Sequence, residues 1–229
     1  MTLYQLKDGY RYNSDTIMLY KFALELNLRG EILEVGAGCG VLGLLLKRDF
    51  SHLNLTLMDI QEENITLCRK NSVKNSLPCD IIHADFGNFK SEKRYNTIIS
   101  NPPFYHDGVI KSENLHLSIS RYSKYLNLRD LISNSSSHLK PCGSLVFCYD
   151  AKQLMDIAAL LEKSKFRMTK IRFIHTKIGK SAKIVLIEAK KNSKSLCDVG
   201  ESLYLSQGDG YSTEVREIFK KANLKSIDV

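Results

Sequence analysis

Short apolar runs rich in isoleucine, leucine and valine recur along the chain and alternate with segments of helical periodicity. Such runs are typical of buried strands, and apolar residues spaced three or four positions apart are typical of helices. The pattern predicts strands over Glu31–Val35, Asn54–Asp59, Cys79–Ala84, Tyr95–Ser100, Gly143–Tyr149, Phe166–Phe173 and Lys183–Lys190. It predicts helices over Asp15–Leu26, Val41–Arg48, Glu62–Asn75, Leu128–His138, Lys152–Lys163 and Thr213–Ala222. Alternating strands and helices indicate an α/β fold around a seven-stranded, mostly parallel sheet.

Seven strands with crossover helices need no second domain, so we expect residues 1–229 to form a single domain. Residues 31–190 form the expected core, 1–30 a helical N-terminal extension and 191–229 a C-terminal extension. Two stretches, Pro102 to Leu126 and Ser193 to Gly210, show no clear periodicity and are expected to be loops. Long loops in compact domains are often functional.

Composition places the chain among ordinary globular proteins, with 43% hydrophobic and 25% charged residues. The longest apolar run is short, Val41 to Leu46, and the N-terminus shows no signal-peptide pattern, so no membrane association is expected. The six cysteines form no C-x-x-C pair and no zinc-like cluster with histidine. We therefore expect free thiols, a cytoplasmic location and no metal.

The net charge of +8 is unevenly distributed along the sequence. Of the 33 basic residues, 11 lie between Lys163 and Lys194, where Glu188 is the single acid, so this segment alone carries +10. A solvated lysine-rich surface is one interpretation. The other is a phosphate-binding stripe that includes Lys177, Lys180 and Lys183.

Glycines at alternate positions follow the first predicted strand of the core, in the string from Glu34 through Gly36 and Gly38 to Gly40. A backbone without Cβ atoms turns sharply off a strand and approaches a ligand closely. This spacing differs from the G-x-G-x-x-G dinucleotide fingerprint and so favours a nucleoside without a pyrophosphate. An ordinary tight turn is the alternative.

The next two predicted strands each end in an acid. Asp59 at the end of the second is suited to accept hydrogen bonds from vicinal ribose hydroxyls. Asp85 and Phe86, which follow the third, are suited to bind the amine and face of an adenine. Either acid alone would more often be a helix cap or a loop residue. Their position beside the glycine loop favours the binding role.

The fourth predicted strand ends in Asn101, Pro102, Pro103 and Phe104, the most specific string in the chain. Pro102 restricts Asn101 to an extended backbone at the carboxyl edge of the sheet. The asparagine oxygen and an adjacent carbonyl are then available to accept from a substrate amino group, and Phe104 to stack on a planar ring. A proline-rich turn over the core is the alternative.

These motifs resemble those of class I S-adenosylmethionine-dependent methyltransferases that modify exocyclic or amide nitrogens. The segment from Gln5 to Asp15, Leu186 to Lys190, and Gly210-Tyr211 are further similar to the bacterial enzymes that N6-methylate adenine next to the anticodon of a valine tRNA. The resemblance runs from Gln5 to about Tyr211; the segment 105–120 matches poorly.

The resemblance implies a Rossmann-like class I domain with helices on both faces, S-adenosylmethionine as cofactor and tRNA as partner. It implies catalytic roles for Asn101, Pro102, Pro103 and Phe104. It implies cofactor contacts from Tyr10, Glu34, Gly36, Gly38, Gly40, Asp59, Ile60, Asp85, Phe86 and Asn101. Arg11 and Arg121 join the three lysines as expected RNA-binding residues. A monomer is expected, and a dimer stays open.

Three other functions stay open at this point. N2-guanine methylation of ribosomal RNA and N5-glutamine methylation of a protein use a similar Asn-Pro-Pro-aromatic motif. A basic RNA-binding protein with an inactive cofactor fold is the non-enzymatic alternative, against which stand the intact glycine loop and the motif at Asn101.

Overall fold

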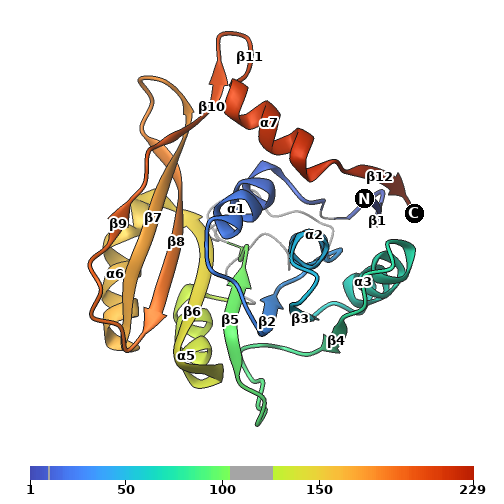
Figure 1. Cartoon of the computed structure of the whole chain (residues 1–229), viewed down its shortest axis with the longest axis horizontal. Coiled ribbons are helices and arrows are strands. Elements are labelled where there is room, and N and C mark those ends of the chain that lie inside the picture. The colour runs from blue at the N-terminus through green and yellow to red at the C-terminus, as the bar shows by residue number, and fades with distance from the viewer. Residues whose placement is uncertain (10, 104–125) are drawn as a thin grey trace.

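The computed structural model describes residues 1–9, 11–103 and 126–229, and its centre is a twisted sheet (Figure 1). Seven strands form the body of the sheet, in the order β4-β3-β2-β5-β6-β8-β7. They are β2 (Glu31–Val35), β3 (Asn54–Asp59), β4 (Asp80–His83), β5 (Tyr95–Ser100), β6 (Leu139–Asp150), β7 (Phe166–Lys177) and β8 (Ala182–Lys191). Strands β2 to β6 run parallel, and β8 is antiparallel to both β6 and β7. All seven predicted strands are confirmed.

The outer edge of β7 carries additional strands that the sequence did not predict. β9 (Asp198–Val199) and β10 (Leu203–Gln207) both pair in parallel with β7, and β11 (Gly210–Tyr211) returns antiparallel to β10. The expectation of a plain loop from Ser193 to Gly210 is therefore wrong. An uncovered β7 would leave a row of unpaired backbone groups, and this segment satisfies them.

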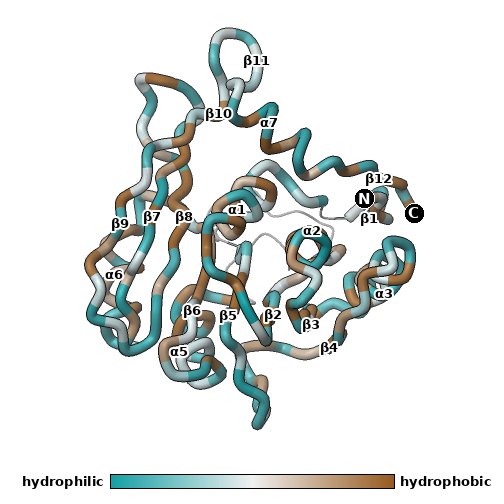
Figure 2. The backbone as a smooth tube through the Cα atoms, viewed as in Figure 1, coloured by the Kyte–Doolittle hydropathy of each residue, from teal (hydrophilic) through white to brown (hydrophobic). Residues whose placement is uncertain are grey.

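Helices cover both faces of the sheet (Figure 1). One face packs against α1 (Ser14–Leu24), α2 (Val41–Asp49), α3 (Glu62–Lys74) and α7 (Thr213–Ala222). The other packs against α5 (Leu128–His138) and α6 (Leu154–Lys163), which follows the short 3₁₀ turn η1 (Ala151–Gln153). Figure 2 shows the apolar positions concentrated along the central strands. The predicted α/β fold with helices on both faces is confirmed.

The two ends of the chain lie side by side. β1 (Thr2–Gln5) pairs in parallel with β12 (Lys225–Asp228), and the N-terminal ammonium donates to Asn223 O at 2.7 Å. The Asn71 side chain of α3 binds both backbone groups of Tyr4, at 2.7 and 3.0 Å. These contacts tie the terminal segments to the helical face formed by α1, α2 and α3.

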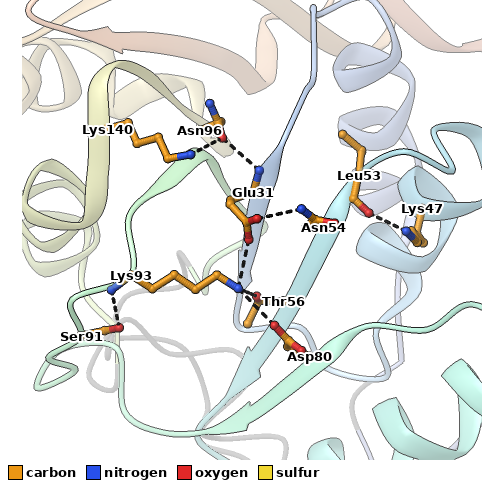
Figure 3. A network of polar contacts seen from close by, with 10 residues as sticks. All are labelled: Glu31, Lys47, Leu53, Asn54, Thr56, Asp80, Ser91, Lys93, Asn96 and Lys140. Atoms are coloured by element: carbon orange, nitrogen blue, oxygen red, sulfur yellow. Dashed lines mark hydrogen bonds and ion pairs between the residues drawn. The ribbon is translucent and has the colours of Figure 1, made fainter.

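A polar network fixes the amino ends of the central strands (Figure 3). Lys93 Nζ lies 3.0 Å from Glu31 Oε2 and 3.1 Å from Asp80 Oδ2, which joins the starts of β2 and β4. Asn96 Oδ1 accepts from Glu31 N and from Lys140 Nζ. The amino edge of the sheet is thereby held by charge pairs, and the opposite edge is left for a ligand.

Neither a membrane span nor a metal cluster is found among the described residues. None of the helices in these ranges is long and apolar enough to cross a membrane. In the same ranges, no group of three or more His, Cys, Asp or Glu side chains is arranged to hold a metal ion.

Candidate active site

A cavity opens at the carboxyl ends of β2, β3, β4 and β5. Ligands of open parallel sheets bind in the crevice outside these strand ends. The walls consist of Val35, Gly36, Gly38, Met58, Asp59, Ile60, Gln61, Asn64, Ala84, Asp85, Phe86, Asn101, Pro103 and Leu126. The structure thus brings together eight of the residues predicted for the site: Gly36, Gly38, Asp59, Ile60, Asp85, Phe86, Asn101 and Pro103.

The glycine loop forms one wall of the cavity. Gly36 and Gly38 adopt φ values of +69° and +56°, which residues with a Cβ rarely adopt. A Cβ placed on either residue would meet no atom within 4 Å, so it would project into free space. The loop therefore leaves room for a ligand to lie directly against its backbone.

Asp59 connects this loop to the start of α3. Its Oδ2 accepts from Gly38 N at 2.8 Å, and its Oδ1 accepts from Gln61 N at 2.9 Å and Asn64 Nδ2 at 3.1 Å. The side chain is buried at the base of the cavity. Gln61 and Asn64 were not predicted as site residues. The sequence signal for them was their position just after Asp59, where the chain turns from β3 into α3.

Asp85 and Phe86 stand at the end of β4. Asp85 Oδ1 accepts from Gly87 N at 2.8 Å and Oδ2 accepts from Asn88 Nδ2 at 2.7 Å, which fixes the turn. The Phe86 ring is buried and lies 5.8 Å from the ring of His138. Phe86 is thus packed mainly into the core and presents only a small surface to the cavity.

The structure places Glu34 and Gly40 beneath the loop, away from the cavity wall. Glu34 Oε2 accepts from Gly43 N at 2.8 Å, and burial raises the pKa of this carboxyl to about 8. A Cβ on Gly40 would meet Leu57 Cδ1 at 3.0 Å, within the core. Neither residue lines the cavity, so a contact of either with the cofactor stays a prediction.

Asn101 directly follows β5 and lines the cavity. Its Nδ2 donates to Thr16 Oγ1 at 2.8 Å, and its Oδ1 accepts from Cys148 Sγ at 2.9 Å. Pro102 is buried and Pro103 lines the cavity. Thr16 and Cys148 were not predicted, since a helical threonine and a strand cysteine carry no sequence signal for such contacts.

Three predicted residues, Tyr10, Phe104 and Arg121, lie outside the described residues. Arg11 is described, and its guanidinium pairs with Asp228 of β12 at 2.7 Å. Arg11 is thus engaged with the C-terminal strand.

The basic segment is divided rather than continuous, so the predicted single stripe is wrong. Lys170 pairs with Glu25 at 3.1 Å, and Arg172 pairs with Glu214 at 2.7 Å. Several others lie toward the amino edge of the sheet: Lys163, Lys165, Arg167, Lys190, Lys191 and Lys194.

The exposed lysines Lys177, Lys180 and Lys183 lie instead at the carboxyl edge, on the hairpin between β7 and β8. The pairing of Asp150 with Ile184 puts the start of β8 beside the carboxyl end of β6. The hairpin therefore stands at the edge of the sheet where the central parallel strands end (Figure 1), and the cavity opens at these strand ends.

The model of the methyltransferase small domain family matches residues 14–175, and the chain belongs to this family.

Two kinds of curated relatives are similar to the chain. The ribosomal RNA small subunit methyltransferase C of Actinobacillus pleuropneumoniae is 31% identical over 142 residues, 62% of this chain. The chain spans only 37% of that relative's length. The tRNA1(Val) (adenine(37)-N6)-methyltransferase of Glaesserella parasuis is 27% identical over 184 residues, covering 77% of this chain and 75% of the relative.

Solved structures show the same fold. A predicted O-methyltransferase from Agrobacterium tumefaciens superposes with a TM-score of 0.68 at 17% identity, covering 94% of this chain and all of that one. The T. thermophilus 16S rRNA N2 guanine methyltransferase, solved with AdoMet and guanosine, gives 0.57 at 20% identity and covers 81% of this chain and 45% of that one. The predicted class I, Rossmann-like methyltransferase fold is confirmed, and S-adenosylmethionine is the cofactor of this fold.

Proposed function

We propose that this protein methylates the exocyclic N6 of an adenine in tRNA, at the position next to the anticodon of a valine tRNA. The observation that carries the proposal is Asn101, which lines the cavity at the carboxyl edge directly before two prolines. Similarity over three quarters of the length of a tRNA1(Val) adenine N6-methyltransferase supports the choice of substrate.

The cavity fits S-adenosylmethionine on geometric grounds, because Gly36 and Gly38 keep free the space that a Cβ would fill. The bound cofactor supplies an activated methyl group. In our proposal the loop backbone faces the amino acid part of the cofactor, and Asp59 accepts from the ribose hydroxyls. Asp85 then lies where it can accept from the adenine amine.

Asn101 acts on the acceptor in this proposal. The lone pair of an exocyclic amine is delocalised into the ring, which makes the amine a weak nucleophile. If Asn101 Oδ1 and the carbonyl oxygen of Pro102 accept its two N–H groups, the lone pair is freed and aimed at the methyl group. The main contribution to rate is then alignment, whose effective molarity reaches on the order of 10⁵ to 10⁸ M.

We assign one part of the basic segment to RNA. This part is the β7–β8 hairpin, which consists of the turn at residues 178–181, including Lys180, and of Lys177 and Lys183 on either side of it. Lys177, Lys180 and Lys183 are exposed, whereas Lys170 and Arg172 are engaged in ion pairs with Glu25 and Glu214. Lysines that neutralise phosphates release counterions and so supply affinity without base specificity. An adenine in an anticodon loop is unpaired and accessible to a cavity of this kind.

N2-guanine methylation of ribosomal RNA is the second candidate, because a ribosomal RNA methyltransferase shares 31% identity over 142 residues. We favour tRNA because the match to the tRNA enzyme extends over far more of both chains. We further propose that the enzyme works in the cytoplasm as a metal-free monomer, with residues 1–30 and 191–229 flanking a core of residues 31–190.

Methyl transfer to fractionated cell RNA tests this function. The protein would be incubated with methyl-labelled S-adenosylmethionine and either tRNA or ribosomal RNA from cells lacking the enzyme, and the RNA then digested to nucleosides. We expect label in N6-methyladenosine from the tRNA fraction. Label in N2-methylguanosine from the ribosomal fraction would instead support the second candidate.

A further inference from the structure

The side chain of Asn101 is held from two sides by residues of other elements. Thr16, in the first turn of α1, accepts from Nδ2 at 2.8 Å, and Cys148, in β6, donates to Oδ1 at 2.9 Å. Both partners are buried. The orientation of the Asn101 amide is therefore set by α1 and β6 as well as by its own strand.

The neighbouring contacts agree with this assignment of donors and acceptors. The Thr16 hydroxyl donates its single proton to Asn13 Oδ1 at 3.4 Å, and Asn13 Oδ1 also accepts from Thr16 N at 3.2 Å as the cap of α1. The hydroxyl then has only lone pairs to offer Asn101, so it faces the amide nitrogen. The Cys148 thiol is a donor and faces the amide oxygen.

We propose that Thr16 is a positioning residue that fixes the Asn101 amide with its oxygen available to the acceptor amine, an inference that rests on the proposed function. A carbonyl oxygen has two lone pairs, and one remains after the contact with Cys148. With the amide reversed, its NH₂ group would face the N–H groups of the substrate. Donor would then meet donor, and the amine would not be held for transfer.

Single substitutions at Thr16 test the inference. Thr16→Val keeps the shape and removes the acceptor, and Thr16→Ser keeps the hydroxyl. We expect Thr16→Val to lower kcat about tenfold, equivalent to about 1.4 kcal/mol. The KM for tRNA and the calorimetric Kd for S-adenosylmethionine should stay unchanged, whereas the melting temperature should fall, because Asn101 Nδ2 loses its partner. Thr16→Ser should restore kcat, and Thr66→Val, at an exposed threonine of α3, serves as the matched control.

A second readout needs no substrate. In protein labelled with ¹⁵N-asparagine, the side-chain amide signal of Asn101, assigned by its loss in Asn101→Ala, should shift and exchange faster in Thr16→Val. It should not change in Thr16→Ser. An unchanged signal in Thr16→Val, wild-type kcat in that variant, or equal loss of kcat in Thr16→Val and Thr16→Ser would overturn the inference.

The failure of the proposed function would look different. Full activity of Asn101→Ala, or no methylation of tRNA by the wild type, would contradict the proposed function and leave the amide signal to decide the role of Thr16.

Discussion

The buried carboxyl of Glu34 accepts a hydrogen bond from the backbone N–H of Gly43, with 2.8 Å between Oε2 and N. The contact joins the end of β2 to α2 across the glycine loop. A Cβ on Gly43 would lie 2.5 Å from the same oxygen and 2.6 Å from Leu57 Cδ2, so a larger residue there would force both side chains to shift. Glu34 thus supports the loop from beneath. Because its carboxyl is buried, its ionisation makes the stability of the protein depend on pH.

The first prediction is that Glu34→Gln changes how stability depends on pH. Burial raises the pKa of Glu34 to about 8, and the charge of Asp59 acts in the same direction. Between the ordinary pKa of a glutamate and about 8, the folded state keeps a proton that the unfolded chain has released. This group therefore lowers the free energy of unfolding as pH rises, by at most about 1.4 kcal/mol per pH unit.

Urea unfolding at pH 5, 6, 7 and 8 measures this effect. The stability of Glu34→Gln relative to the wild type should rise through this range, because glutamine does not titrate. Glu63→Gln, at an exposed carboxyl of α3, controls for the loss of a charge. A stability difference between Glu34→Gln and the wild type that is the same at every pH would show that Glu34 is ionised in the folded protein.

The second prediction concerns Gly38→Ala, which should weaken S-adenosylmethionine binding at least about tenfold, or about 1.4 kcal/mol. The new Cβ would project into the cavity beside the loop, where φ is also positive. Gly208→Ala is the matched control, because Gly208 has φ +63° and open space but lies in the turn between β10 and β11. Both variants should lose similar stability, and only Gly38→Ala should lose affinity in calorimetry. Equal Kd values of the two variants for S-adenosylmethionine would contradict the assignment of the glycine loop to the cofactor site.

The third prediction is that Asp59→Ala weakens cofactor binding by about 1–3 kcal/mol, because ribose hydroxyls would be left without an acceptor. Asp59 also accepts from Gly38 N and Gln61 N, so the melting temperature should fall as well. Affinity for tRNA should change little. Calorimetry with both ligands checks this, and an unchanged Kd for S-adenosylmethionine would contradict the ribose assignment.

The fourth prediction separates the two ends of the basic segment. Replacing Lys177, Lys180 and Lys183 with alanine should weaken tRNA binding. The slope of log affinity against log salt should flatten by about 0.7–0.9 for each phosphate that the variant no longer neutralises. A triple alanine variant of Lys163, Lys165 and Lys194 removes the same charge at exposed sites away from the cavity edge. Equal flattening in both variants would mean that net charge alone, and not the hairpin, determines RNA affinity.

The seven central strands were predictable because each is a short apolar run. Such a run is visible in the local sequence, without knowledge of the strand with which it pairs. Asp59, Asp85 and Asn101 were predictable together because the ends of parallel strands meet at one edge. The strands β9 to β11 were not, since their pairing depends on the free edge of β7 and not on an apolar pattern of their own.

The sequence also did not predict in which direction some side chains point. The position of Glu34 two residues before the glycine loop predicted a contact with the cofactor. In the structure its carboxyl accepts a hydrogen bond from Gly43 N. Charge counting likewise included Lys170 and Arg172 in the basic segment, although they form ion pairs with Glu25 and Glu214, which are distant in sequence. Such contacts are set by tertiary structure, which local spacing does not reveal.

The identity of the methylated atom tests the central claim most directly. Two valine tRNA transcripts, one with adenine and one with guanine at position 37, would be incubated with methyl-labelled S-adenosylmethionine and digested to nucleosides. We expect N6-methyladenosine from the adenine transcript, no label from the guanine transcript, and no label from either with Asn101→Ala. Label recovered as N2-methylguanosine, or full activity of Asn101→Ala on the adenine transcript, would contradict adenine N6-methylation at this site.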